Sequence, residues 1–465
     1  MGGGGANYPT LTAAFADVTA NGLCGNLYLE LQSAYSSAGE TFPLVPPTLA
    51  TISQTITIYP AVTGLSITSA STTQTFNLNG AGYIILDGRV MMTGTAKDLV
   101  IENTSTSGNA IQFINEASNN TVKYCTLRGV RSSTTSGVIV FSTTTGTNGN
   151  DNNTIDNCDI RDGASTPYNL VYSSGSTTSV ATANSNNVIS NCNIYNWFYA
   201  SGDNRGIYLA GGTTDWTITG NSFYQTASRA LGSGYITAPI YILNTTSGNN
   251  FTITNNYVGG SAPLGGGGAM TYTGAGVMRL FYLSTASSVP NSIQGNVFKN
   301  ISFTTSSAST SQSCISVLNG AYNIGNVSGN TLGDPALTNS IAFTGSGSSA
   351  VFCGMLMGTG TTTLGAFNIQ NNVIAGIAIG GTGTTNVRGI SVQQSATPTA
   401  ASVWTVSNNT IGSTSVANSI SNSTANGMIG IAAFIGSATL PVPCTISNNT
   451  IANLTCTITG TGTSN

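Results

Sequence analysis

Apolar and polar residues recur along this chain in a short motif that returns about every 36 residues. Each copy reads apolar, any residue, Asn or Gly, Asn or Cys, any residue, apolar, and only Tyr124 departs from this pattern at the third position. The copies are Val122–Leu127, Ile155–Ile160, Ile189–Ile194, Ile218–Phe223, Ile253–Val258, Ile293–Phe298, Val327–Leu332, Ile369–Ile374, Val406–Ile411 and Ile446–Ile451.

A second apolar block lies between successive motifs, for example Gly206–Leu209 and Pro239–Leu243. These blocks are short, rich in β-branched residues and bounded by Gly, Ser, Thr and Asn, which is typical of strands and turns. Two or three short strands in each repeat predict an all-β solenoid, and the repeat length favours a right-handed parallel β-helix. We expect it to span residues 51–465 in coils of about 36 residues.

The motif has a physical explanation in a β-helix. Asn and Gly tolerate positive φ, so the chain is expected to bend at the third position and to point the fourth side chain inward. Coils stack about 4.8 Å apart, so inward amides can bond from coil to coil. The predicted structural ladder contains Cys125, Cys158, Cys192, Asn221, Asn256, Asn296, Asn330, Asn372, Asn409 and Asn449.

The three cysteines of this ladder allow two interpretations. We interpret them as buried free thiols that replace Asn. A metal site or disulfides are the alternatives. The other five cysteines, Cys24, Cys314, Cys353, Cys444 and Cys456, show no metal-like spacing. We therefore expect no cofactor and no metal, with calcium kept open only for an enzymatic alternative.

The N-terminus differs from the repeats. Residues 1–6 read as a flexible tail, and residues 7–50 as an N-terminal cap with the first strands. Within the cap, Tyr8–Thr19 is expected to form a short amphipathic helix, capped by Thr10 or Thr12, that covers the open end of the β-helix. The other end stops in the Gly/Thr-rich segment Cys456–Asn465, so we interpret the sequence as a fragment of a longer chain.

Composition excludes several classes of function. Only 5% of the residues are charged, 11 basic and 14 acidic, and none is His. Without His, a Ser-His-Asp triad and most zinc sites are impossible. The scattered Lys and Arg residues indicate no nucleic-acid partner. No apolar run reaches about 18 residues, so we expect no membrane insertion.

The repeats "NNTI", "ISNCNI" and "ISNNTI" resemble the PbH1 β-helix repeats of pectate-lyase-like proteins. The segments "NYPTLTAAFADV", "NLYLELQSAY" and "YIILDGRV" are similar to β-helix regions of very large surface proteins of gliding-type bacteria. The resemblance implies type IX secretion, an extracellular or cell-surface location and an adhesin or structural role. It also implies, as partners, other segments of a longer parent chain and glycans or other cell-surface components.

Relatives of this fold include lyases, which need clustered carboxylates with calcium and Arg. Residues 87–162 hold 14 of the 25 charges, and rung alignment places Lys123 beside Asp156. We interpret this region as an outward ladder of ion pairs, with a calcium or substrate site as the alternative. The candidate charge cluster is Asp156, Asp159, Asp162, Arg128 and Arg161.

Tyrosines recur in the second block at steps close to one coil. Alternation sends their apolar neighbours inward and the tyrosine rings outward. A row of such rings suits a sugar chain, whereas simple cross-coil stacking is the alternative. The candidate glycan contacts are Tyr172, Tyr208, Tyr241 and Tyr282, with Tyr195 and Tyr224 as a second pair.

These observations favour an extracellular surface-protein segment with a structural or adhesive role that contacts glycans and is not an enzyme. Two alternatives stay open. The first is a carbohydrate-active β-helix enzyme of the polysaccharide-lyase type, and the second is a non-catalytic glycan-binding module.

Overall fold

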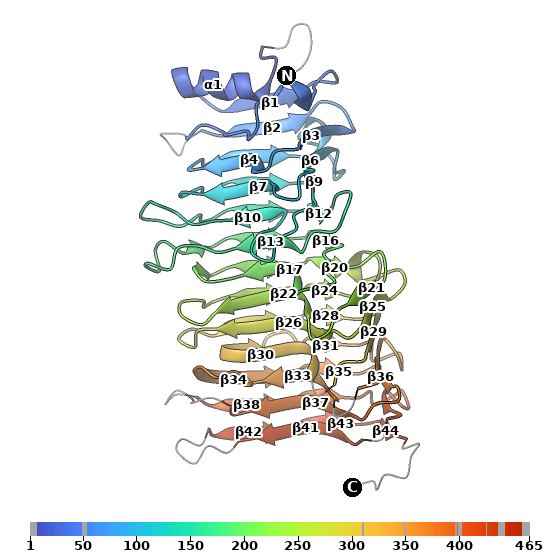
Figure 1. Cartoon of the computed structure of the whole chain (residues 1–465). Coiled ribbons are helices and arrows are strands. Elements are labelled where there is room, and N and C mark those ends of the chain that lie inside the picture. The colour runs from blue at the N-terminus through green and yellow to red at the C-terminus, as the bar shows by residue number, and fades with distance from the viewer. Residues whose placement is uncertain are drawn as a thin grey trace. The chain divides into compact units, whose positions relative to one another are not determined.

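The computed structural model describes residues 7–48, 54–308, 311–347, 350–395, 398, 402–424, 426–435 and 442–457. The expected tail, residues 1–6, lies outside these ranges. The chain divides into two compact units, which Figure 1 shows with their strands labelled. The N-terminal unit comprises residues 1–198 and 207–221, and the C-terminal unit comprises residues 199–206 and 222–465.

Three parallel sheets, named A, B and C, build the N-terminal unit. Sheet A runs through β1 (Leu27–Leu31), β2 (Ile56–Pro60), β5 (Ile84–Asp87), β8 (Thr121–Lys123), β11 (Thr154–Asp156), β15 (Val188–Ser190) and β19 (Thr217–Thr219). Sheet B runs through β4 (Gln74–Asn79), β7 (Asn109–Ile114), β10 (Ile139–Phe141) and β13 (Asn169–Ser173). Sheet C runs through β3 (Leu65–Ser69), β6 (Leu99–Asn103), β9 (Cys125–Gly129), β12 (Asp159–Asp162) and β16 (Asn193–Tyr195). A short pair joins β14 (Asn184–Ser185) to β18 (Thr213–Thr214), and β17 (Asn204–Leu209) has residues in both units.

The C-terminal unit has four parallel sheets, A to D. Its sheet A runs through β23 (Thr252–Thr254), β27 (Asn291–Gln294), the end of β30 (Ser311–Ile324), β34 (Leu364–Gln370), β38 (Trp404–Ser407) and β42 (Cys444–Ser447). Its sheet B runs through β22 (Ile236–Asn244), β26 (Val277–Thr285), the start of β30, β33 (Ala350–Met357), β37 (Thr385–Gln393) and β41 (Met428–Phe434).

Sheet C of the C-terminal unit is narrow. It runs through β20 (Ser222–Tyr224), β24 (Tyr257–Val258), β28 (Val297–Phe298), β31 (Thr331–Leu332), β35 (Val373–Ile374), β39 (Thr410–Ile411) and β43 (Thr450–Ile451). Sheet D runs through β21 (Arg229–Leu231), β25 (Met270–Gly274), β29 (Ile301–Thr305), β32 (Ile341–Gly345), β36 (Ile377–Gly380), β40 (Ile420–Asn422) and β44 (Leu454–Cys456). The sequence did not predict this fourth strand per coil.

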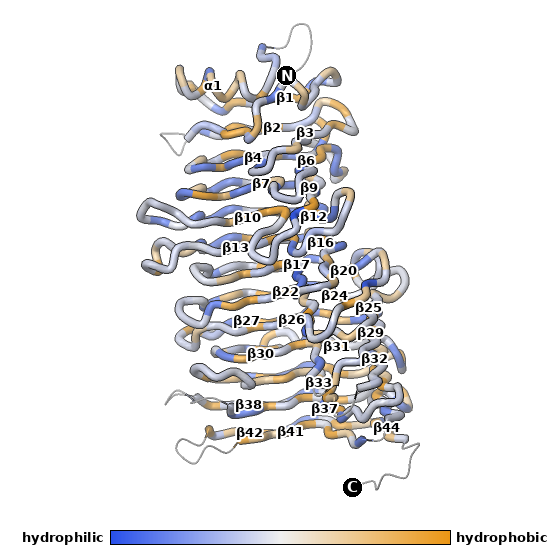
Figure 2. The backbone as a smooth tube through the Cα atoms, viewed as in Figure 1, coloured by the Kyte–Doolittle hydropathy of each residue, from blue (hydrophilic) through white to orange (hydrophobic). Residues whose placement is uncertain are grey.

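Parallel pairing between equivalent strands of successive coils confirms the all-β class and the parallel β-helix. The first apolar residue of most motifs enters the core, since Val122, Ile155 and Ile189 are ladder partners and are at most 1% exposed. Val327 and Ile446 are exceptions, at 84% and 46% exposed. Stretches of hydrophobic residues accordingly run along the strands in Figure 2. Burial of each such side chain contributes about 1.5–3 kcal/mol to folding.

The chain bends at the third motif position, as the sequence predicts. Asn157, Asn191 and the exceptional Tyr124 all have φ of 52°. Gly329 is different, because it is not among the residues with positive φ. A Cβ atom at Gly329 would clash with the backbone carbonyl of Asn371, so close approach of the next coil explains this glycine.

The predicted N-terminal helix is confirmed as α1 (Leu11–Asn21). Thr10 caps it by accepting a hydrogen bond from the Ala13 N–H at 3.0 Å, and the Glu40 carboxylate accepts the Leu11 N–H at 2.7 Å. Its buried face consists of Leu11, Ala14, Phe15 and Val18, and α1 lies beside β1 in Figure 1. Short 3₁₀ turns lie in loops of the described ranges, namely η1 (Ser37–Gly39), η2 (Val90–Met92) and η3 (Pro263–Gly265). In the part of the chain that is described, no helix has the length and hydropathy to span a bilayer.

Candidate functional site

Asparagine side chains of the C-terminal unit form a continuous ladder that is buried up to its last rung, Asn449, which is partly exposed. The backbone N–H of each rung donates to the Oδ1 atom of the next rung, and its Nδ2 atom donates to the same Oδ1, at distances of 2.9–3.0 Å. The rungs are Asn256, Asn296, Asn330, Asn372, Asn409 and Asn449. Every rung thereby satisfies backbone groups that the bend would otherwise leave unpaired.

Cysteines occupy the equivalent positions in the N-terminal unit. The Cys158 N–H donates to the Cys192 sulfur at 3.3 Å, and the Cys192 N–H donates to Oδ1 of Asn221 at 2.9 Å. Cys125, Cys158 and Cys192 are free thiols and are at most 1% exposed. Burial raises the pKa of the Cys125 and Cys192 thiols well above the ordinary value, so these sulfurs stay protonated.

A second ladder in the N-terminal unit escaped the sequence analysis. The Asn120 N–H donates to Oδ1 of Asn153 at 3.1 Å, and the Asn153 N–H donates to Oδ1 of Asn187 at 2.9 Å. These residues lie two positions before the first motif residue, so the repeated "NNT" and "NNV" letters carry the signal. The Asn120 ladder lies just before the sheet A strands and the cysteine ladder just after them. Hydrogen bonds therefore join successive coils at both ends of these strands.

The charge cluster lies on outward columns of sheets A and C in the N-terminal unit. Lys123 is the ladder partner of Asp156, as the sequence predicts, yet its amine lies 3.4 Å from Oδ2 of Asp87. Asp156 instead accepts hydrogen bonds from Ser190 at 2.6 Å and from Asn191 at 3.0 Å. The carboxylate is therefore already satisfied by hydroxyl and amide donors.

The other members of the cluster are also paired. Arg128 is the ladder partner of Arg161 but forms an ion pair with Glu102, while Arg161 pairs with Asp162 at 3.1 Å. Asp159 pairs with Lys97. Within the described ranges, no group of three or more Cys, Asp or Glu side chains has a geometry suited to a metal ion. Apart from Asp156, the charges of the cluster thus form ion pairs, within one strand for Arg161 and Asp162 and between coils for the others. Each pair is worth about 0–1 kcal/mol at such partly exposed positions.

Asp87 is the most buried carboxylate of this region. Its side chain is 2% exposed, and Arg89 donates to it through Nη2 at 2.6 Å and through Nε at 2.9 Å. Burial by itself would raise the pKa of Asp87, but the hydrogen bonds from Arg89 and the charges of Lys123 and Arg89 outweigh it and lower this pKa. Sequence reasoning missed this residue because it lies before the first motif.

Tyr172 lines a polar groove on sheet B of the N-terminal unit, with a volume of about 490 Å³. Its ladder partner Val140 and the next partner, Gln112, lie in the groove, together with Gln74 and Asn109. The Tyr208 ring contacts Tyr172 edge to face, with centroids 5.2 Å apart. The groove therefore combines partly exposed aromatic surface with amide groups that both donate and accept hydrogen bonds.

Arg131 also lines this groove. Its Nη1 atom donates to the Ser107 carbonyl, whereas its Nε atom is buried without a partner among the described residues. Burial lowers the pKa of Arg131. Sequence reasoning did not single out Gln74, Asn109 or Gln112, because their convergence depends on the register of β4, β7 and β10.

The remaining tyrosine candidates are less accessible. In the C-terminal unit, Tyr241 and Tyr282 are ladder partners with ring centroids 4.8 Å apart. Tyr241 is only 7% exposed, and the Arg205 guanidinium lies 4.4 Å from its ring centroid. Tyr195 and Tyr224 are 9% and 6% exposed, which leaves little ring surface for a ligand.

No family model and no curated protein matches this chain. Among solved structures, the chain is similar to AlyGC, an alginate lyase of the PL6 family, with 9% sequence identity and a TM-score of 0.16. The alignment covers 92% of this chain and 96% of that chain. At this identity and TM-score, the likeness assigns neither an activity nor a substrate.

The prediction that this chain is not an enzyme is nevertheless contradicted, because the protein found in that comparison is an enzyme. The prediction relied on the absence of His and on the pairing of the charge cluster. That reasoning was too narrow, since Lys, Tyr and carboxylate side chains also act as general acids and bases. The exclusion of catalysis is therefore withdrawn.

Proposed function

We propose that this chain is a carbohydrate-binding β-helix segment of an extracellular surface protein with a structural or adhesive role. The observation that carries the proposal is the groove beside Tyr172, which is lined by the aromatic ring and by the partly exposed side chains of Gln74 and Gln112. Sugar rings pair apolar C–H faces with hydroxyl groups, and these two features match aromatic surface and amide groups respectively.

The ladders support the structural part of the proposal. Amide and thiol rungs tie successive coils together at the same bend, in addition to the strand hydrogen bonds. Such satisfied buried polar networks rigidify a core. A rigid scaffold holds groove residues from separate strands in one geometry, which reduces the ordering cost of binding.

Binding of the full chain to a panel of neutral and acidic polysaccharides tests the proposal. We expect Tyr172→Ala to weaken the affinity for the best ligand about fivefold, since loss of one aromatic contact is worth about 1 kcal/mol. Tyr28→Ala is the matched control, because Tyr28 is 54% exposed on β1 outside the groove. Equal affinity of Tyr172→Ala and wild type, or no binding by wild type, would contradict the proposal.

Polysaccharide cleavage in the same groove is the second candidate function. It is favoured by Arg131, which lines the groove together with Tyr172. A lyase needs a cation near the sugar carboxylate and a base near the acidic C–H, and these two residue types can supply both roles. The test is release of unsaturated ends from acidic polysaccharides by wild type, with loss of that product in Arg131→Ala and not in Tyr28→Ala.

A further inference from the structure

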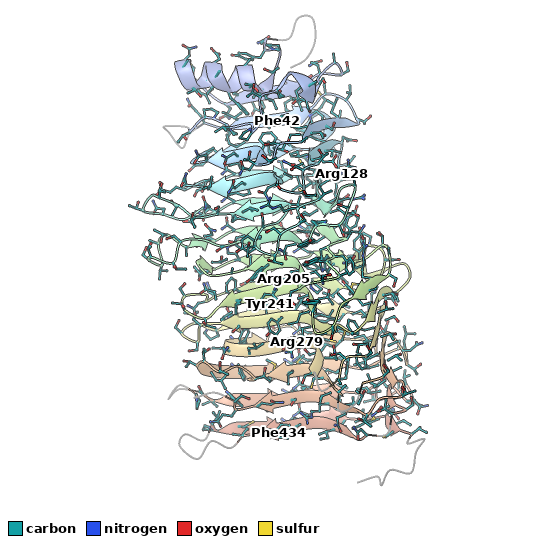
Figure 3. All side chains as sticks on the ribbon, viewed as in Figure 1. Phe42, Arg128, Arg205, Tyr241, Arg279 and Phe434 are labelled. Atoms are coloured by element: carbon teal, nitrogen blue, oxygen red, sulfur yellow. The ribbon has the colours of Figure 1, made fainter. Side chains whose placement is uncertain are left out.

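Charge is divided unevenly between the two units. The N-terminal unit has six Lys or Arg against twelve Asp or Glu, whereas the C-terminal unit has five Lys or Arg against two Asp, a net charge of +3. Three of those five cations, Arg205, Arg279 and Arg388, lie on strands β17, β26 and β37. Figure 3 labels Arg205 and Arg279 on either side of Tyr241, whose strand β22 lies between β17 and β26.

Each of these arginines lies over an aromatic ring. The guanidinium carbon is 4.4 Å from the ring centroid of Tyr241 for Arg205, 5.2 Å from that of Tyr282 for Arg279 and 4.6 Å from that of Phe434 for Arg388. An arginine on an aromatic ring thus recurs along the C-terminal unit. The rings hold the guanidinium planes in place without neutralising their charge.

Arg279 and Arg388 belong to one outward column of sheet B in the C-terminal unit. Arg279 is the ladder partner of Ser313, Ser313 of Cys353, and Cys353 of Arg388. Three rungs at the usual spacing place the two arginine backbones about 14 Å apart. Both arginines are partly exposed, whereas the small residues between them are fully buried beneath neighbouring side chains.

This column contains donors that lack acceptors. Arg279 donates from Nη1 to the Ser316 hydroxyl at 3.0 Å, but the Nε atoms of Arg279 and Arg388 are buried without hydrogen-bond partners in the described part of the unit. The hydroxyl of Ser313, a residue with 0% exposure, has no partner there either. Neither Arg279 nor Arg388 forms an ion pair with any described carboxylate, and Asp203 is paired with Arg205 at 2.8 Å.

The Cys353 thiol lies in the same column, between Ser313 and Arg388, and its pKa responds both to burial and to the arginine charges. Burial raises its pKa to about 12, and the positive charges of Arg388 and Arg279 both act against that rise. Burial also lowers the pKa of Arg279. Positive charge is therefore held in a poorly solvated place, where an arriving anion is stabilised more strongly than in water.

We propose that the outer face of this sheet, from Arg279 to Arg388, binds the carboxylate or sulfate groups of an anionic polysaccharide. Guanidinium groups bind such oxyanions through paired N–H donors. The two arginines are about 14 Å apart, which is too far for one small anion to contact both. A polymer with repeated negative charges can contact both. The inference deepens the proposed function by naming the ligand class, and it uses residues separate from the Tyr172 groove.

Binding of polygalacturonate to the full chain tests this site, with the fully methyl-esterified polymer as the uncharged probe. The test variant is Arg279→Gln/Arg388→Gln. The matched control is Arg229→Gln/Lys299→Gln, which removes the same charge from the same unit on β21 and after β28. We expect the test variant to bind polygalacturonate at least tenfold more weakly and the control to bind within twofold of wild type. Thermal unfolding checks that both variants remain folded.

Further arms separate the ligand classes. Wild type is expected to prefer polygalacturonate to its methyl ester and to lose that preference as salt rises. If the test variant binds polygalacturonate as tightly as wild type, or if the control variant loses as much affinity as the test variant, the proposed site is wrong. Stronger binding of single-stranded DNA or of inorganic sulfate at equal charge would overturn the polysaccharide assignment. Loss of binding in Tyr172→Ala with retention in Arg279→Gln/Arg388→Gln would leave the groove standing and reject this inference alone.

Discussion

The backbone N–H of Cys158 donates a hydrogen bond to the thiol sulfur of Cys192, 3.3 Å away. The same geometry occurs between Asn296 and Asn330, where the acceptor is Oδ1 at 3.0 Å. Each acceptor also serves as a donor, since the Cys192 thiol lies 3.6 Å from the Ile155 carbonyl and Nδ2 of Asn330 lies 2.9 Å from the Ile293 carbonyl. A cysteine thus replaces both roles of an asparagine in this fold.

The amide ladder leads to a prediction about stability. Asn330→Ala should destabilise the chain by about 1–3 kcal/mol, because it leaves the N–H of Asn296 buried without its acceptor. Asn339→Ala is the control, since Asn339 is exposed. Denaturant unfolding measures both variants. Equal stability of the two would show that the ladder contributes nothing.

Buried thiols predict a loss of stability in alkali. Burial raises the pKa of Cys314 above its ordinary value of 9.0. A raised folded-state pKa contributes stability that is complete below the unfolded pKa and is lost as pH rises through the folded pKa. The free energy of unfolding should therefore fall above about pH 9, by up to about 1.4 kcal/mol per pH unit for each such thiol.

Two variants test whether buried thiols cause this loss of stability above about pH 9. Cys314→Ala should flatten the dependence of stability on pH above about pH 9, because one buried thiol is gone. Cys24→Ala should leave that dependence unchanged, since Cys24 is exposed. Identical pH profiles for Cys314→Ala and wild type would refute the assignment to buried thiols.

Asp87 predicts a loss of stability in acid. Its lowered pKa contributes stability that is present above the ordinary value of 3.8 and is lost as pH falls through the folded-state pKa. Asp87→Asn should cost about 1–3 kcal/mol near neutral pH, because Arg89 and Lys123 lose their charged partner. The difference from wild type should shrink in acid, where Asp87 is protonated. Asp98→Asn is the control, since Asp98 forms no ion pair with a described residue.

The last described coil predicts self-association. Its outer residues Ile429, Phe434, Ile446 and Ile451 are 46–51% exposed, on strands β41, β42 and β43. Exposed apolar strand edges favour pairing with further strands. Sedimentation of residues 1–465 should show concentration-dependent association, which Ile446→Lys/Ile451→Lys should reduce. Val327→Lys should not reduce it, although Val327 is 84% exposed. A monomer at all concentrations would rule out this association.

The repeat determines the parallel β-helix directly from the sequence. Each motif has a residue that tolerates positive φ, such as Asn157, followed by a residue whose side chain points inward. These two residues determine where the coil bends. These preferences are local, so they can be recognised without knowledge of distant contacts. The register of neighbouring strands follows as well, since Lys123 and Asp156 are partners as the motif alignment predicts.

The tertiary structure decided which side chains meet. Lys123 lies between Asp87 and Asp156 in its column and pairs with Asp87, because Ser190 and Asn191 already satisfy Asp156. The alternation of apolar residues predicts an outward, accessible Tyr241 ring, but in the structure the Arg205 guanidinium covers that ring. Long side chains reach across a coil spacing of about 4.8 Å and choose among several partners. The choice depends on loops of variable length and on competing hydrogen bonds, which the local pattern does not encode.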